Sequence, residues 1–115
     1  MTDIKSLQET IRRFIEEREW DQHHNPKDLA ESVVLEAAEL MEHFQWKNEE
    51  EARKHVNAHR EEIGDECADV FIYLLEFCNQ SGIDLIGAAH RKMEKNALKY
   101  PVEKAKGNAK KYTEL

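Results

Sequence analysis

Two pairs of carboxylates are the feature of this sequence that could most readily do chemistry. Glu36 and Glu39 lie in the stretch VVLEAAELMEHFQW, and Glu66 and Asp69 lie in EIGDECADVFIYLL. A spacing of three residues places both members of a pair on one face of a helix. Acids are mostly exposed in folded proteins, yet both pairs stand beside apolar stripes. The spacing therefore singles out these four side chains as a candidate functional cluster.

A cluster of four carboxylates on two adjacent helices would need a cation or protons, because like charges repel strongly at low dielectric. Hard oxygen ligands select Mg²⁺, Mn²⁺ or Ca²⁺. Mg²⁺ commonly shares its coordination shell with substrate phosphates, so the cluster suits a polyphosphate substrate. A single pair of this kind is ordinarily solvated surface charge. The alternative hypothesis is a non-catalytic helical oligomer or adaptor with a solvated acidic face.

Two other interpretations of the acids are weaker. The segment EIGD, from Glu62 to Asp65, has the same spacing, but a helical projection turns Asp65 away from the stripe edge, which favours Glu66 and Asp69. A di-iron bundle requires Glu-x-x-His motifs on two helices. None of the six histidines has a glutamate three residues before it, so this class is disfavoured.

The elements that must position these acids are helices, since strand-like alternation is nearly absent. Four main helices are predicted, over about residues 3–20, 25–46, 60–79 and 84–100. The segment 48–59 is either continuous helix or a short helix and a bend. Helix starts are expected at capping residues, namely Thr2 or Asp3, Asn25, Asn48 and Asp84. Ser81-Gly82 and Pro101 are expected to end helices. The predicted fold is all-α, a four-helix bundle.

Helical spacing also predicts which side chains are buried. The apolar stripe of 25–46 consists of Leu29, Val33, Ala37, Leu40, Met41 and Phe44. That of 60–79 consists of Ile63, Cys67, Val70, Phe71, Leu74, Phe77 and Cys78. Leu35, Ala38 and Ile72 lie opposite these stripes, where a single bundle would expose them. We therefore expect a homo-oligomer, a tetramer or a dimer.

Length and composition narrow the remaining choices. The 115 residues suggest one helical domain over 1–103, followed by a polar tail over 104–115. A net charge of −7 argues against a nucleic-acid partner. No apolar run is long enough to span a membrane. Cys67 and Cys78 would lie about 16 Å apart along one helix, too far for a disulfide. They fit buried thiols in a reducing cell, and we expect a cytoplasmic protein.

The sequence segments around the acids resemble those of a known family. The segments EREWDQHHNP, ELMEHFQWK, DVFIYLL, KMEKNALKYP and KYTEL occur in the order typical of MazG-like, all-α nucleoside triphosphate pyrophosphohydrolases, in the dCTP pyrophosphatase branch. The resemblance covers residues 14 to 115. It implies a tetramer-forming four-helix fold. It also implies Mg²⁺-dependent hydrolysis, with Mn²⁺ as a substitute, of dCTP or several dNTPs to the monophosphate and pyrophosphate, in nucleotide-pool housecleaning.

The resemblance also implies roles for individual residues. The metal ligands would be Glu36, Glu39, Glu66 and Asp69, with Glu36 or Glu39 as the general base. Substrate-binding positions would be Trp46 against the base, Trp20 and His24 near the base and phosphates, Tyr73 beside the sugar, and Lys92 and Asn96 at the phosphates. One departure is Ile11, which stands where the eukaryotic dCTP enzymes have a base-side histidine. The 48–59 connection also lacks the prolines expected in that branch.

Overall fold

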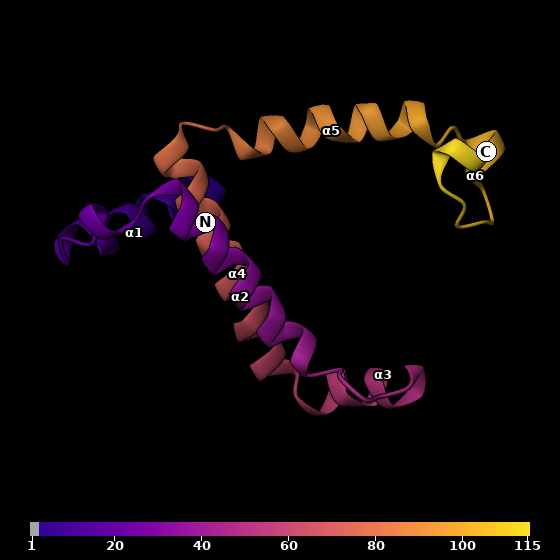
Figure 1. Ribbon diagram of the computed structural model, residues 1–115, viewed down its shortest axis with the longest axis horizontal. Helices are drawn as coiled ribbons and strands as arrows, with labels where there is room; N and C mark the ends of the chain where they lie inside the picture. The colour runs from indigo at the N-terminus through magenta and orange to yellow at the C-terminus, as the bar shows by residue number, and fades with distance from the viewer. Residues whose placement is uncertain (1–2) are drawn as a thin grey trace. The chain divides into compact units, whose positions relative to one another are not determined.

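The computed structural model describes residues 3–115, and every regular element in that range is helical (Figure 1). The elements are α1 (Ile4–Glu17), η1 (Asp21–His23), α2 (Pro26–Glu42), α3 (Glu49–Ala58), α4 (Arg60–Ser81), α5 (Leu85–Lys99), α6 (Val102–Ala105) and η2 (Tyr112–Glu114). The prediction of an all-α fold is confirmed. Within the described range, none of the helices combines the length and apolarity that crossing a membrane requires.

Side-chain caps fix the helix starts where the sequence predicted them. The Asp3 carboxylate accepts from the Ser6 N–H at 2.8 Å, and the Asn25 side chain accepts from the Asp28 N–H at 2.9 Å. Asp84 caps α5 through the Gly87 N–H at 3.1 Å. These bonds satisfy amide groups that have no partner within the first helical turn. Thr2, the alternative cap of the first helix, lies outside the described residues.

The connection between the two longest helices is a short helix and a bend. Asn48 and Glu51 form a reciprocal capping box that starts α3. The backbone leaves helical geometry at His59, with φ −124°, before α4 begins. The predicted helix over 25–46 is too long, because α2 ends at Glu42 in a tightened turn. Trp46 then adopts the left-handed region, with φ 68°.

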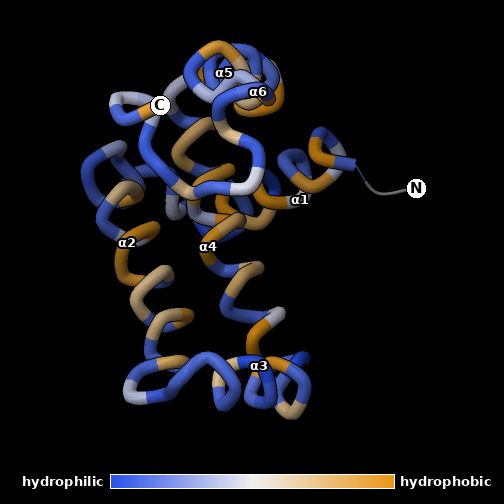
Figure 2. The backbone as a smooth tube through the Cα atoms, turned by 90° about the vertical axis from the view of Figure 1, so that its right-hand side faces the viewer, coloured by the Kyte–Doolittle hydropathy of each residue, from blue (hydrophilic) through white to orange (hydrophobic). Residues whose placement is uncertain are grey.

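The chain divides into two compact units, one ending at Gly82 and one spanning Ile83–Leu115. In the first unit α2 and α4 lie side by side and antiparallel, α1 packs on α4, and α3 crosses the end of the pair (Figures 1 and 2). In the second unit the Tyr100 and Tyr112 rings meet edge to face, 6.1 Å apart. The four-helix bundle, and the division into a 1–103 domain and a 104–115 tail, stay predictions.

The core of the first unit lies around α4. Its buried apolar residues are Ile11, Ile15, Leu29, Ile63, Leu75 and Cys78. Leu75 is fully buried although the predicted stripe omits it, because α4 packs against both α1 and α2 and so buries a wider face than one stripe. The expectation of two buried thiols is half wrong: Cys78 is buried, but Cys67 is exposed.

Candidate functional site

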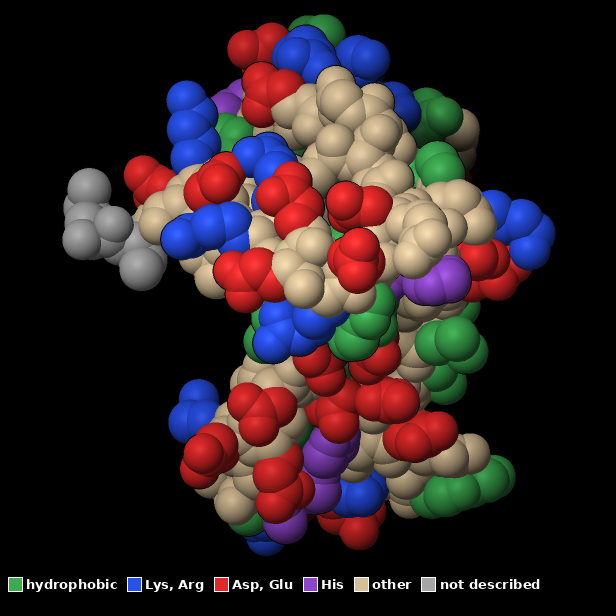
Figure 3. Space-filling view, turned by 90° about the vertical axis from the view of Figure 1, so that its left-hand side faces the viewer, with side chains coloured by type: hydrophobic (Ala, Val, Ile, Leu, Met, Phe, Trp, Pro, Cys, Tyr) green, Lys and Arg blue, Asp and Glu red, His purple; other side chains and the backbone are tan. Residues whose placement is uncertain are grey.

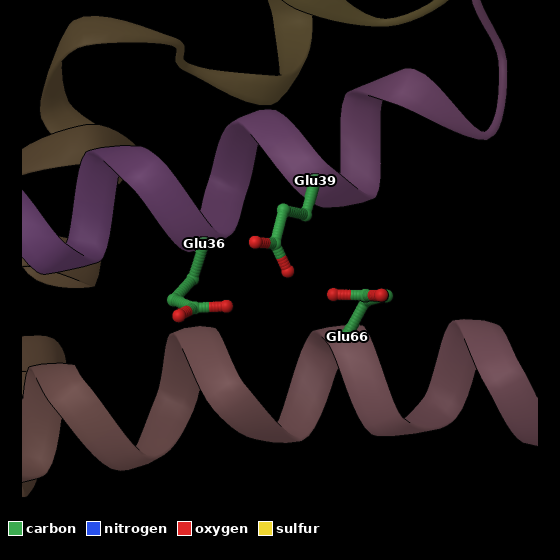
Figure 4. Close-up of side chains that lie close together, drawn as sticks. All are labelled: Glu36, Glu39 and Glu66. Atoms are coloured by element: carbon green, nitrogen blue, oxygen red, sulfur yellow. The ribbon is translucent and has the colours of Figure 1, made fainter.

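Three of the four predicted acids converge between the two central helices. Glu36 and Glu39 point from α2 toward Glu66 on α4 (Figure 4). One carboxylate oxygen from each lies within 4.8 Å of the others. The antiparallel packing of α2 on α4 brings the two sequence motifs face to face. We call Glu36, Glu39 and Glu66 the acid trio.

The acid trio is electrostatically strained. Burial raises the pKa of Glu36, and the charges of Glu39, Asp69 and Glu66 raise it further. Burial also raises the pKa of Glu66, with additional contributions from Glu39 and Asp69. The Oε2 atom of Glu66 is buried and has no hydrogen-bond partner among the described residues. A divalent cation would relieve both the repulsion and the unpaired oxygen, so these residues fit a hard metal ion.

Asp69 lies beside the acid trio rather than within it. It follows Glu66 on α4 and its charge acts on Glu36 and on Tyr73. Its side chain is exposed and lines the cavity next to the trio. The predicted quartet is therefore arranged as three converging acids and a fourth that connects them to a neighbouring cavity.

That neighbouring space, which we call the aromatic cavity, has a volume of about 370 Å³. It lies between α1, the turn before α2, and α4, and is lined by Leu7, Thr10, Ile11, Phe14, Ile15, Trp20, His24, Asp69, Ile72, Tyr73 and Glu76. The Trp20 ring packs edge to face on Phe14 at 5.8 Å and lies 6.1 Å from the His24 ring. Three predicted substrate-binding residues thus meet in one place: Trp20 and His24 from the connection between α1 and α2, and Tyr73 from α4.

Glu76 is the residue of this cavity that sequence reasoning missed. It is only 8% exposed, and burial raises the pKa of its carboxyl group. The His24 Nδ1 atom lies 3.3 Å from Glu76 Oε2, and the histidine charge partly opposes that rise in pKa. The sequence does contain a sign that Glu76 is buried: it is the only acid in the apolar run Phe71–Cys78.

A second space, the histidine hollow, opens on the other side of the acid trio, with a volume of about 530 Å³. Its lining residues are Glu39, Glu42, His43, Lys47, His55, His59, Glu62 and Glu66. Figure 3 shows acidic side chains gathered around histidines on one face of the molecule. His43 Nδ1 lies 3.0 Å from His55 Nε2, and burial lowers the pKa of His55. The sequence analysis did not anticipate this hollow.

The remaining predicted residues are not brought to the acid trio. Trp46 is 92% exposed beyond the end of α2 and lines neither space. Lys92 and Asn96 are four residues apart on α5, in the second unit, so they share one face of that helix. Their roles in substrate binding stay predictions.

Comparison with known proteins finds close relatives. The MazG-like family matches residues 32–115. The dCTP pyrophosphatase 1 of Bos taurus is 40% identical over 113 residues, which cover 93% of this chain and 67% of that protein. The Homo sapiens protein of the same name is 39% identical over 93% of this chain and 66% of its own length. A solved pyrophosphatase structure from Archaeoglobus fulgidus superposes with a TM-score of 0.84 at 41% identity, covering 88% of this chain and 94% of that one.

Proposed function

Because the chain belongs to the MazG-like family and is a nucleotide pyrophosphohydrolase, we propose that it cleaves dCTP, or several dNTPs, to the monophosphate and pyrophosphate. The chain spans about two thirds of its mammalian relatives, which are named for dCTP. One observation carries the proposal: the acid trio has a buried oxygen without a partner among the described residues, and Asp69, one turn further along α4, lines the aromatic cavity. Its role would be to clear nucleotides in the cytoplasm.

The acid trio and Asp69 would hold Mg²⁺, with Mn²⁺ as a substitute. When bound, the ion neutralises phosphate charge and lowers the pKa of a coordinated water. The carboxylates supply hard oxygen ligands from both central helices. The ion would therefore be held only while α2 and α4 stay packed together.

Glu36 or Glu39 would accept the proton of the attacking water. The water oxygen bonds to the α-phosphorus, the bond from that phosphorus to the α,β-bridging oxygen breaks, and pyrophosphate leaves. One of these two carboxylates would then lie outside the ion's first coordination shell, where it can take the proton.

The two spaces flanking the acid trio suggest how the substrate lies. The aromatic cavity would take the base against Trp20 and the sugar beside Tyr73, since aromatic rings provide stacking surfaces. The triphosphate would then run along the acids into the histidine hollow, where Lys47 offers a positive charge to the distal phosphates. The bulk of the Tyr73 ring would exclude a ribose 2′-hydroxyl.

A homo-oligomer, a dimer or a tetramer, is also part of the proposal. Val34, Leu35 and Met41 on α2 are 67%, 65% and 64% exposed, and Trp46 beyond the helix is almost fully exposed. Apolar surface of this kind favours association with another copy of the chain. A monomer in sedimentation at micromolar concentration would contradict this part of the proposal.

Pyrophosphate release tests the function directly. The purified chain is given Mg²⁺ and a panel of dNTPs and NTPs, with Glu31→Gln as a control because Glu31 is exposed on α2 and pairs with Lys27 at 2.7 Å. We expect release from deoxynucleotides, with dCTP among the best substrates, and no release without a divalent cation. Absence of release from every nucleotide would favour the non-catalytic alternative.

A further inference from the structure

Glu76 is an unusual side chain for the interior of a small protein. It is 8% exposed, on α4, in a cavity with aromatic and aliphatic neighbours. Its Oε2 atom is buried and accepts no hydrogen bond from any described residue. A buried carboxyl group without a hydrogen-bond partner destabilises the folded state, because its lost hydration is not replaced. A residue kept at such a cost is a candidate for contact with a ligand.

The neighbouring polar groups do not satisfy this carboxyl group. His24 Nδ1 comes within 3.3 Å of Oε2, yet that contact is an ion pair only when the imidazole is protonated, and it makes no hydrogen bond. The Thr10 hydroxyl, in the same cavity, donates to the Ser6 carbonyl at 3.1 Å instead. Glu76 thus retains acceptor capacity toward the aromatic cavity.

The α1 side of the same cavity is apolar except for Thr10, whose hydroxyl donates to the Ser6 carbonyl. Ile11 is 6% exposed and purely apolar, and Phe14 and Ile15 are its neighbours on that helix. A charged group able to accept a hydrogen bond from the edge of a stacked base is therefore supplied by α4 rather than by α1. Glu76 is the most buried polar group in that position.

We propose that Glu76 reads the polar edge of the base, accepting a hydrogen bond from an exocyclic amino group and so selecting cytosine over thymine or uracil. This inference rests on the proposed function, because it requires a nucleoside in the aromatic cavity. Cytosine carries an amino group where thymine and uracil carry a carbonyl oxygen. A carbonyl oxygen would face the carboxyl acceptor without a donor between them. The cavity of about 370 Å³ is at the small end of ligand pockets, which suits a pyrimidine.

The expected loss of preference for dCTP on substitution of Glu76 follows from how binding sites distinguish similar ligands. A site built to hydrogen-bond a substrate group rejects an analogue without that group strongly, because buried polar groups then stay unpaired. Glu76→Gln keeps the shape of the side chain but adds an amide donor, which can turn toward a carbonyl oxygen. We expect this variant to lower the ratio of kcat/KM for dCTP over dTTP by about tenfold or more.

The experiment measures that ratio, with dUTP as a second keto substrate, for the wild type, Glu76→Gln and Glu76→Ala. Glu17→Gln is the matched control, because Glu17 is exposed on α1 and lines no part of the cavity. Calorimetric titration with dCMP and dTMP gives a readout that does not depend on catalysis. Circular dichroism identifies any variant that fails to fold, and Glu76→Gln removes a buried acid, so it should fold at least as well as the wild type.

The outcomes separate the two proposals. Loss of the preference for dCTP and dCMP in both Glu76 variants, with the control unchanged, supports Glu76 as the base reader. A ratio that stays at the wild-type value in Glu76→Gln and Glu76→Ala would overturn this inference and leave the pyrophosphohydrolase intact. If the wild type cleaves no nucleotide but still binds dCMP more tightly than dTMP through Glu76, the proposed function fails and the base-reading role stands.

Discussion

The two spaces beside the acid trio differ in almost every property. The aromatic cavity is covered by α1, holds about 370 Å³, and combines Trp20 and Tyr73 with one buried carboxyl group. The histidine hollow is bordered by the highly charged α3, holds about 530 Å³, and is lined only by Glu, His and Lys. This difference supports the proposed orientation of the nucleotide, with its base in the aromatic cavity and its phosphates toward the histidine hollow.

The difference arises from what packs on α4. At its C-terminal half α1 contributes the apolar residues Ile11, Phe14 and Ile15, which line one side of the aromatic cavity. At its N-terminal end α3 follows a capping box and contributes His55 and exposed ion pairs such as Lys54 with Glu50, at 3.3 Å. Placed between an apolar and a polar neighbour, the acid trio is only partly desolvated, which raises the pKa of Glu36 without enclosing it.

The largest expected effect comes from substituting the acids that lie between the two spaces. Asp69→Asn and Glu36→Gln should each lower kcat/KM for dCTP by about 100-fold or more, because they remove a metal ligand or the proton acceptor. Circular dichroism should show an unchanged helical signal. A fully active Asp69→Asn enzyme would show that the fourth acid has no place in the site.

A smaller effect is expected at the sugar end of the aromatic cavity. The wild type should strongly prefer dCTP to CTP, and Tyr73→Ala should reduce that preference by about tenfold, because the ring no longer clashes with a 2′-hydroxyl. Equal hydrolysis of both nucleotides by the wild type would exclude Tyr73 as the sugar gate. A preference that persists in Tyr73→Ala would place the gate on another residue.

The charged end should show a still smaller effect. Lys47→Ala should raise KM for dCTP about three- to fivefold, because an exposed charge contributes up to about 1 kcal/mol. Binding of dCMP, which lacks distal phosphates, should not change. Lys54→Ala is the control, since this lysine is on α3 but does not line the hollow. Equal weakening of dCTP and dCMP would contradict the proposed orientation.

The smallest effect concerns stability without metal. Glu36 and Glu66 have pKa values raised above the ordinary 4.5, so the folded state binds their protons more tightly than the unfolded state does. Stability from these groups is fully present below pH 4.5 and declines as pH rises through the raised values. Glu36→Gln should therefore raise Tm by a few degrees at pH 7 but not at pH 4, as differential scanning calorimetry can check. An equal change in Tm at both pH values would show that repulsion between Glu36 and the neighbouring carboxylates does not destabilise the fold.

Several of these features could be predicted from the sequence, because they depend on local rules. The caps at Asp3, Asn25 and Asp84 follow from side chains that reach backbone amides within one turn. The pairing of Glu36 and Glu39 follows from helical spacing, and their approach to Glu66 needed only the assumption that two helices pack together.

Features that depend on tertiary packing could not be predicted in the same way. Leu75 and Glu76 are buried because α4 packs against both α1 and α2. Helical spacing alone predicted a single buried stripe on this helix. The histidine hollow combines His43 with His55, which meet because the connection between α2 and α3 turns α3 back toward the end of α2. Trp46 is left exposed because α2 ends earlier than its apolar pattern.

The central claim is that α2 and α4 share one metal-dependent site, and Glu66→Gln tests it most directly. Glu66 is the member of the acid trio supplied by α4, and its buried Oε2 atom has no hydrogen-bond partner within residues 3–115. Calorimetric titration with Mn²⁺ and pyrophosphate release from dCTP are measured on the same wild-type and Glu66→Gln samples. The account predicts that metal affinity and pyrophosphate release fall together while the helical fold persists. Wild-type rates of release from dCTP by Glu66→Gln would contradict it.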